Sequence, residues 1–378
     1  MGELLDARTA AERLGVDVRT LYAYVSRGSL RRVPGPDGRS SRYDADDLQL
    51  LAKRSRPRTL PRPAASIDLV IATRVSTVTD GVVRYRGVNV ADLVAAREPF
   101  ERVTELLWGS PAGDPGAGGG EGAPPPDGLP VLHRFAIAVA TMPETAPGPA
   151  QADPDWPGYG RRLIDRLAGC RAAGGRAGDG QAGDEAGPFA GRLWRRWSPL
   201  TPTPPRVRAL NTALVLLAEH ELALSTLSVR VAASARAIPS ACVLAGLSAL
   251  SGALHGGAGR AVHELLAGRA AGQQPDPSAR PPGFGHPVHR HGDPRTRPLL
   301  DAVYGFATAA DRELIESTAT LAAAPPNVDF ALAALSYAAR MPPEAATAIF
   351  AIARTAGWIA HAAEEYGEPP LRFRGHAF

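Results

Sequence analysis

The feature that most constrains the fold is a helical periodicity that runs from about residue 204 to the C-terminus. Apolar residues there recur at three- and four-residue spacing, and Pro/Gly turns at 281–294 and 325–326 interrupt the pattern. Most of these residues are Ala, Leu and Val, of which Ala is the best helix former, and aromatic residues make up only 6% of the chain. We therefore predict an all-α protein, in which 378 residues suffice for one large domain or two unequal ones.

The positive charge of the chain lies near its N-terminus. Residues 1–63 contain 13 Arg and Lys against 8 Asp and Glu, a net charge of +5, while the whole chain carries +4. The remaining residues are therefore close to neutral, at −1. This distribution favours a nucleic-acid partner for residues 1–63, whereas charge alone predicts no such partner for the remainder.

The pattern of residues 1–54 is typical of a small DNA-binding module. An amphipathic helix at 7–15 is followed by a Gly-containing turn, in which Asp17 can cap a second helix at 18–28. A Pro/Gly turn and a closing helix at 44–54 complete a pattern that resembles the winged helix-turn-helix of MerR-type and excisionase-type proteins. The candidate DNA-binding residues are Arg19, Arg27, Arg31, Arg32 and Arg42. The alternative is a protein-docking unit, or a relic that no longer binds DNA.

Composition also indicates the domain boundaries. Residues 55–66 are basic and contain several prolines, and we predict that they link the module to a body at 67–378. Two stretches of this body, 110–130 and 170–190, are rich in Gly, Ala and Pro and are predicted to be loops or disordered.

Several classes of protein are disfavoured. Cys170 and Cys242 show neither a metal-binding spacing nor a disulfide framework, and the histidines lack HxH or HExxH spacing, so we predict no metal site. The N-terminal MGELLDARTA lacks the basic-then-apolar order of a signal peptide. The apolar stretch at 238–254 is interrupted by Pro and Ser and predicts a buried helix. We therefore expect a cytoplasmic protein without a membrane span.

Four short clusters carry the residues suited to catalysis. They are EHE at 219–221, SGALHGGA at 251–258, GFGHPVHRHGDPR at 283–295 and PNVDF at 326–330. Taken singly, each has a structural explanation, since a Gly-rich break is usually a turn and Asp329 can cap the helix that follows it. In this order, however, the last three strongly resemble the signature segments of the citrate synthase family. VVRYRGVNVADL at 82–93 resembles that family's N-terminal LRYRG-type segment, and the resemblance spans about residues 67–378.

The resemblance implies a large helical domain and a smaller one at about 235–335, which close over the substrates. It implies condensation of acetyl-CoA with oxaloacetate, with the CoA thioester as a substrate and no other cofactor. Asp329 would take a proton from the acetyl methyl group, His255 would donate to the thioester oxygen, and His286 would polarise the ketone. These residue types suit the chemistry, because a carboxylate among apolar neighbours becomes more basic and a neutral imidazole can donate to a developing oxyanion.

The resemblance also implies which groups bind each substrate. The residues matched to oxaloacetate binding are His220, Arg295, Arg354 and Arg372. A guanidinium is a forked cationic donor and suits a dicarboxylate. Arg372 corresponds to an arginine that reaches the neighbouring subunit's site, so we expect a homodimer with a shared active site. The candidate CoA-binding residues are Gly256, Gly257, Gly285 and Arg290.

Several alternatives stay open. The segments depart from the family pattern at Ala253, Gly259 and Pro287, so propionyl-CoA, which would give 2-methylcitrate, stands beside acetyl-CoA as the acyl donor. The rival from another class is a DNA-binding regulator whose citrate synthase-like body senses a CoA ester or oxaloacetate. The intact set of Asp329, His255 and His286 favours the enzyme. A third interpretation, citryl-CoA cleavage, would call for an ATP-handling domain.

Overall fold

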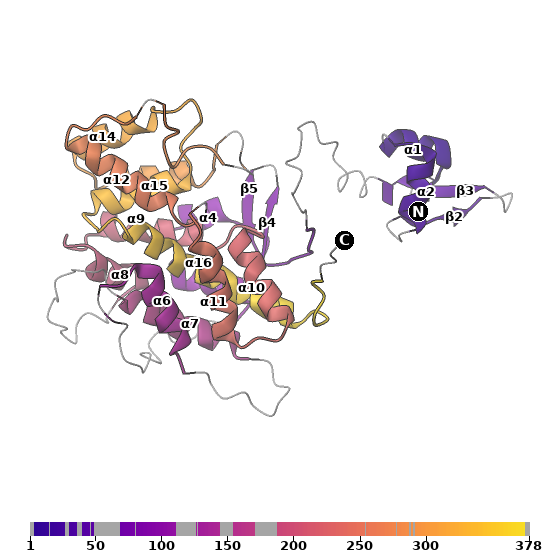
Figure 1. Cartoon of the computed structure of the whole chain (residues 1–378), viewed down its shortest axis with the longest axis horizontal. Coiled ribbons are helices and arrows are strands. Elements are labelled where there is room, and N and C mark those ends of the chain that lie inside the picture. Colours follow the sequence, from indigo (N-terminus) through magenta and orange to yellow (C-terminus); the bar gives the residue numbers. More distant parts are fainter. Residues whose placement is uncertain are drawn as a thin grey trace. The chain divides into compact units, whose positions relative to one another are not determined.

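The computed structural model describes residues 4–14, 16–26, 30–35, 40–45, 47–48, 69–79, 81–110, 126, 128–143, 154–170, 187–253, 255–276, 278–286, 289 and 292–374. The predicted linker at 55–66 lies outside these residues, as do most of 110–130 and 170–190. The chain divides into two compact units, Met1–Ile71 and Ala72–Phe378, and each has its own apolar core (Figure 1).

The first unit combines two helices with three short strands. Its elements are β1 (Leu4–Asp6), α1 (Ala7–Leu14), α2 (Val18–Ser26), β2 (Val33–Pro34) and β3 (Ser41–Asp44). The strands form an antiparallel sheet in the order β1-β3-β2. The carboxylate of Asp17 accepts from the N–H of Thr20 at 2.6 Å and caps α2, as its position in the sequence predicts. Leu21 and Tyr43 join helix and sheet in one core. The predicted closing helix at 44–54 falls mostly outside the described residues.

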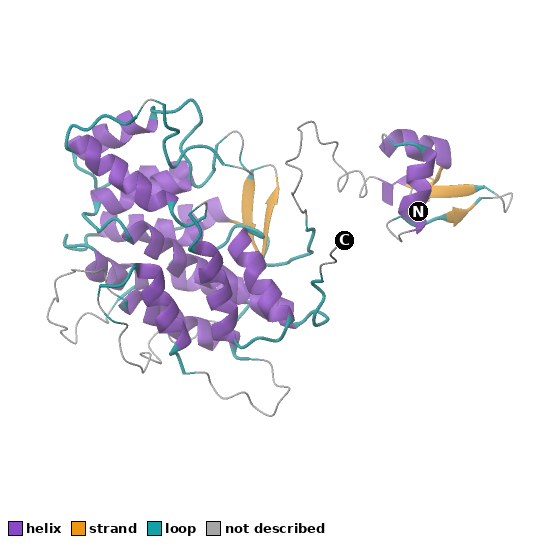
Figure 2. Ribbon diagram, viewed as in Figure 1, coloured by secondary structure: helices purple, strands orange, loops and turns teal. Residues whose placement is uncertain are grey.

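The second unit is mostly helical (Figure 2). Its helices are α4 (Val90–Ala95), α5 (Phe100–Trp108), α6 (Val131–Ala140), α7 (Trp156–Gly169), α8 (Phe189–Trp197), α9 (Pro204–Leu217), α10 (Leu224–Ser234), α11 (Pro239–Leu250), α12 (Ala258–Ala270), α13 (Thr296–Tyr304), α14 (Ala309–Ala319), α15 (Val328–Ala338) and α16 (Ala345–Tyr366). The 22-residue α16 is buried along most of its length and packs against α7, α9, α10 and α11. α12 packs against α14 and α15, inside the region predicted to be the smaller domain (Figure 1). No described helix is long and apolar enough to cross a membrane.

A second sheet corrects the all-α prediction. Its strands are β4 (Ser76–Thr79), β5 (Val82–Tyr85) and β6 (Val88–Asn89), which form an antiparallel meander in that order. Ser76 pairs with Tyr85, and Gly81 and Gly87 adopt positive φ angles of 78° and 86° beside the strand ends, where glycine is favoured. Strands of two to four residues are too short for their alternation to be recognised in the sequence.

Candidate active site

His220 is held at the end of α9 by a tyrosine from the sheet. The buried hydroxyl of Tyr85 donates to the carbonyl oxygen of Glu219 at 2.9 Å and accepts the N–H of the same residue at 3.1 Å. Burial raises the pKa of Tyr85, so its hydroxyl remains a donor. These bonds satisfy backbone groups that the end of α9 leaves unpaired, and they fix the segment that carries His220.

The segments that carry His286 and Asp329 are joined through their backbones. The N–H of Gly285 donates to the carbonyl oxygen of Pro325 at 2.8 Å. The amide of Asn327 donates to the carbonyl oxygen of Gly285 at 2.9 Å, and its Oδ1 accepts the N–H of Asp329 at 3.0 Å. Asn327 is therefore the N-cap of α15, and the capping explanation for Asp329 is wrong. The helix cap leaves the carboxyl of Asp329 for another role.

Arg295 is anchored by Asp293 in a two-point ion pair. Its Nε lies 2.9 Å from Oδ1 and its Nη2 lies 2.7 Å from Oδ2, with the side chain of Arg295 only 4% exposed. Oδ2 also accepts the N–H of Val328 at 3.2 Å, in the first turn of α15. Asp293 thus connects the guanidinium to the helix that carries Asp329. The same Nη2 lies 3.5 Å from Nε2 of His286.

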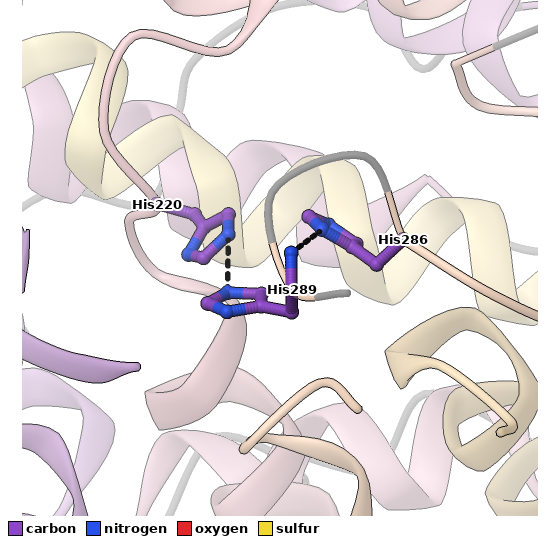
Figure 3. Close-up of side chains that lie close together, drawn as sticks. All are labelled: His220, His286 and His289. Carbon is purple, nitrogen blue, oxygen red and sulfur yellow. Dashed lines mark hydrogen bonds between the residues drawn. The ribbon is translucent and has the colours of Figure 1, made fainter. Parts of the chain in front are cut away.

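Three imidazoles lie close together (Figure 3), and one of them, that of His286, lies beside Arg295. Nε2 of His220 lies 3.2 Å from Nε2 of His289, and the backbone N–H of His289 donates to Nδ1 of His286 at 3.2 Å. The ring centroids are 4.8 to 5.5 Å apart. Because Nδ1 of His286 accepts a hydrogen bond, the ring proton belongs on Nε2. Nε2 of His286 and Nη2 of Arg295 are then two donors 3.5 Å apart, an arrangement that suits an acceptor bound beside both.

Burial and neighbouring guanidinium groups keep these imidazoles neutral. Burial lowers the pKa of His220 far below its ordinary value, and the charges of Arg295 and Arg354 lower it further. Burial, with Arg295 as the next cause, lowers the pKa of His286 to about 4. Arg354 is itself buried, and its Nε donates to the carbonyl oxygen of Leu217 at 3.0 Å. Two buried cations with neutral donors beside them suit an anionic ligand.

The charges of Arg295 and Arg354 also affect the carboxyl of Asp329. Burial raises its pKa to about 6; the charges of Arg295 and Arg354 oppose that rise, and the charge of Asp293 adds to it. Such a carboxylate is a stronger base than an exposed aspartate and is still mostly ionised at pH 7.

A metal ion is the alternative ligand for the imidazole cluster. Nitrogens of His220, His286 and His289 lie within 4.8 Å of one another, close enough for one ion. The sequence spacing predicts no metal, yet the fold brings these histidines together. Arg295, at 3.5 Å from His286, would hold its positive charge next to a bound cation. The electrostatics of the cluster therefore favour an anion.

His255 lies on the turn between α11 and α12. Its Nε2 is 2.9 Å from the hydroxyl of the fully buried Ser225. Burial lowers its pKa, and Arg354 adds to this effect, so His255 lies within electrostatic reach of the guanidinium that also affects His220. Gly256 and Gly257 follow directly, and a Cβ at Gly256 would lie 2.2 Å from a backbone oxygen of α11. The turn is therefore packed too closely for a side chain there.

Arg372, a predicted oxaloacetate-binding residue, does not join this cluster. Nε and Nη2 of Arg372 each lie 2.6 Å from a carboxylate oxygen of Glu365 in the same chain. At a rise of 1.5 Å per residue, Glu365 lies about 16 Å further along α16 than Arg354. The pairing with Glu365 therefore holds Arg372 away from the cluster in its own chain. Arg290, the candidate phosphate contact, lies outside the described residues, while Gly285 directly precedes His286.

Motif analysis missed three side chains that contact the predicted set. Asp293 stands two residues before Arg295, and that short acid-to-arginine spacing was an available signal. His289 stands in a histidine-rich segment, three residues after His286. Ser225 offered no local signal, because it precedes His255 by 30 residues.

Comparisons with known proteins show the family to which the chain belongs. Residues 123–372 match the family model described as citrate synthase, C-terminal domain. The chain belongs to the citrate synthase family. It is 31% identical to the putative citrate synthase 2 of Mycobacterium tuberculosis over 323 residues, which cover 75% of the chain and 83% of that protein. It is 35% identical to citrate synthase 2 of Bacillus subtilis over 184 residues, which cover 44% of the chain and 49% of that protein, about half its length.

Solved citrate synthases share the fold. The enzyme of Thermoplasma acidophilum, solved as a ternary complex with carboxymethyl-coenzyme A and oxaloacetate, superposes with a TM-score of 0.61 at 22% identity, over 82% of this chain and 93% of that chain. The enzyme of Pyrobaculum aerophilum gives 0.60 at 20% identity, over 82% and 89%. These superpositions confirm the mostly helical citrate synthase fold. The unit Met1–Ile71 lies outside the residues that the family model matches.

Proposed function

We propose that this chain condenses acetyl-CoA or propionyl-CoA with oxaloacetate and water, giving citrate or 2-methylcitrate and free CoA. Membership of the citrate synthase family supports the reaction class. The observation that carries the proposal is the carboxyl of Asp329, which burial makes more basic although Arg295 and Arg354 lie within electrostatic reach. A base in such surroundings can remove a proton from carbon and be left neutral beside a bound anion.

The proposed chemistry divides among three side chains. Asp329 takes a proton from the carbon next to the thioester carbonyl, while His255 donates a hydrogen bond to the thioester oxygen as the enolate forms. The enolate carbon then attacks the ketone carbon of oxaloacetate, so that a carbon–carbon bond forms and the thioester carbonyl is restored. The ketone oxygen takes its proton from Nε2 of His286, the nitrogen that the bond from His289 leaves protonated. Water finally hydrolyses the thioester and CoA leaves.

The two carboxylates of oxaloacetate would bind the cationic side of the cluster. Arg295 keeps guanidinium donors beyond those that Asp293 accepts, and Arg354 and His220 lie in the same neighbourhood. For CoA, we propose that backbone amides near Gly256, Gly257 and Gly285 approach the nucleotide, with Arg290 as a phosphate contact. The buried guanidinium groups of Arg295 and Arg354 support the assignment for oxaloacetate.

Release of CoA thiol tests the function. Wild-type protein is given oxaloacetate with acetyl-CoA or propionyl-CoA, and Asp329→Asn is compared with Asp276→Asn, which changes an exposed loop carboxylate. We expect the first variant to lose about 10²- to 10⁴-fold in turnover and the second to match the wild type. The ratio of the two acyl donors identifies the substrate. No thiol release from folded wild type with either donor would refute the proposal.

We also propose a homodimer in which Arg372 completes the partner's site. Exposed apolar side chains lie on and beside α10, at Leu224, Val231 and Ile238. The N–H of Leu371, itself exposed, donates to the carbonyl oxygen at the end of α10, so Arg372 lies next to this apolar surface. Such surfaces mark association sites. Sedimentation should give a dimer for the wild type, and Val231→Glu should shift it toward a monomer that has lost turnover.

DNA binding by the unit Met1–Ile71 is the second candidate function. It is favoured by Arg19, Arg31 and Arg32, which are exposed on a unit built from two helices and a small sheet. Arg42 is half-buried, and Arg27 lies outside the described residues. Fluorescence anisotropy with duplex DNA should show an affinity that falls steeply with salt and is unaffected by Asp329→Asn. If the protein does not bind DNA at low salt, the alternative is that this unit docks onto another protein.

A further inference from the structure

One residue, His289, contacts both of the histidines that the proposed reaction uses. Its backbone N–H donates to His286, and its side-chain Nε2 lies 3.2 Å from Nε2 of His220 (Figure 3). Its side chain is 6% exposed, so the imidazole pair is shielded from water. Nothing in the proposed chemistry requires His289 to touch a substrate. Any effect it has must therefore pass through its two neighbours.

The contact between the two Nε2 atoms limits where protons can lie. Burial lowers the pKa of both rings, and Arg295 lowers it further, although Asp293 opposes this at His289. Both rings are therefore neutral, and each neutral imidazole has one N–H and one lone pair. Two nitrogens at 3.2 Å need one proton between them, so either His220 or His289 is the donor. The donor ring presents a lone pair at its other nitrogen, and the acceptor ring presents an N–H there.

The remaining nitrogen of His220 decides between these arrangements. Its Nδ1 is buried and has no hydrogen-bond partner among the described residues. A lone pair at this atom would repel a carboxylate, whereas an N–H would donate to one. An anionic ligand therefore selects the arrangement in which His289 donates from Nε2 and His220 carries its proton on Nδ1.

We propose that the side chain of His289 is a positioning residue, which donates to Nε2 of His220 and thereby turns Nδ1 of His220 into a donor for an oxaloacetate carboxylate. The proposal rests on the proposed function, and it adds a residue that the motifs did not assign. It concerns binding of the 2-oxo acid and leaves the acyl-CoA side of the site unaffected.

The test replaces His289 by two amide side chains of different length. In His289→Gln the carboxamide nitrogen can take the place of Nε2, whereas in His289→Asn it lies near the place of Nδ1 and falls short of His220. Both variants bury a polar amide and keep the backbone N–H that His286 accepts. We expect His289→Asn to raise the KM for oxaloacetate about 10- to 100-fold, the size of a lost hydrogen bond to a charged group. His289→Gln should restore most of that loss, and the KM for acyl-CoA should change in neither.

A double-mutant cycle with His220→Ala shows whether the effect passes through His220. Once His220 is absent, His289→Asn should raise the oxaloacetate KM no further. An equal rise for both substrates, no rescue by Gln, or full additivity with His220→Ala would overturn the proposal. Thermal unfolding of each variant checks that it folds. If His289→Asn does not fold, the oxaloacetate KM of His289→Gln is measured instead.

Two measurements do not depend on turnover. Ring ¹⁵N spectra of histidine-labelled protein report the tautomer directly, and the proposal requires N–H at Nδ1 of His220 when oxaloacetate is bound. Calorimetry measures oxaloacetate affinity in the same variants. If the wild type bound oxaloacetate but released no CoA, the proposed function would fail, while these data would still decide the role of His289. A proton on Nε2 of His220 would refute the tautomer assignment.

Discussion

The carboxyl of Asp329, on a half-buried residue, has opposite effects on catalysis and on stability. Its pKa is about 6 in the folded chain, against an ordinary value of 3.8, and burial is the main cause. Since the folded-state pKa is the higher one, the folded state holds the proton more tightly than the unfolded chain does. The resulting stabilisation is complete below about pH 4 and is lost as the pH rises through about 6. Above about pH 6, ionisation of this carboxylate lowers the free energy of unfolding by up to about 3 kcal/mol, and solvent screening reduces this cost.

The first prediction follows from the upward shift of the Asp329 pKa on folding. Asp329→Asn, which abolishes the base, should raise the free energy of unfolding at pH 7.5 by about 1–3 kcal/mol relative to the wild type, because it removes a buried charge of nearly the same shape. At pH 4, where the wild-type carboxyl is protonated, the difference should nearly vanish. Urea unfolding at the two pH values measures it. A variant that is less stable than the wild type at pH 7.5 would contradict the assignment of a raised pKa.

At the scale of elements, the site depends on the pairing of the loop before α13 with the loop before α15. Asn327 makes this pairing specific, because its Oδ1 caps α15 and its amide donates to Gly285, directly before His286. Gly283 allows its loop to approach α15 closely, since its φ is 83° and a Cβ there would lie 3.2 Å from the Cβ of Phe330. The side chain of Asn327 therefore adds to the backbone bonds that set the separation of the proposed base and the proposed acid.

The second prediction tests that pairing. Asn327→Ala should lower the free energy of unfolding by about 1–2 kcal/mol through loss of the cap, and should lower kcat because His286 and Asp329 lose their shared anchor. Asn327→Asp keeps the capping oxygen but loses the donor to Gly285, so it should recover most of the stability and little of the activity. Denaturant unfolding and CoA release separate the two effects. Equal recovery of both by Asp would argue against the anchor.

The helices could be predicted from the sequence because their signal is local. Three- and four-residue apolar spacing predicted the helices after residue 204, and Asp17 predicted the start of α2. The β4–β6 meander was missed because its strands hold two to four residues each. Motifs identified His220, His286 and Arg295, which the fold brings together. The contact of His289 with His220 could not be predicted, because 69 residues separate the two along the chain.

At the scale of the whole molecule, buried polar contacts run along α16 from the His220 segment to Arg372. Glu219 pairs with His361 at 3.2 Å, and Arg230 lies 2.9 Å from both His361 and Glu365. Glu365 in turn accepts both donors of Arg372 at 2.6 Å. Removing one member would leave a buried charge unpaired, at a cost of about 3–5 kcal/mol. Through this series of buried contacts, α16 holds Arg354 beside His220 and fixes the base of Arg372 at the apolar surface on α10.

The third prediction concerns the division of the chain into two units. Every described residue of the proposed reaction lies in Ala72–Phe378, and the two units have separate apolar cores. A chain that starts at Ile67 should therefore fold and release CoA at a rate close to that of the full chain, while losing salt-dependent DNA binding if Met1–Ile71 supplies it. Thiol release and DNA anisotropy on the same two proteins measure both properties. Loss of turnover in a folded, dimeric truncation would mean that the N-terminal unit takes part in catalysis, and would remove the basis for treating DNA binding as a separate function.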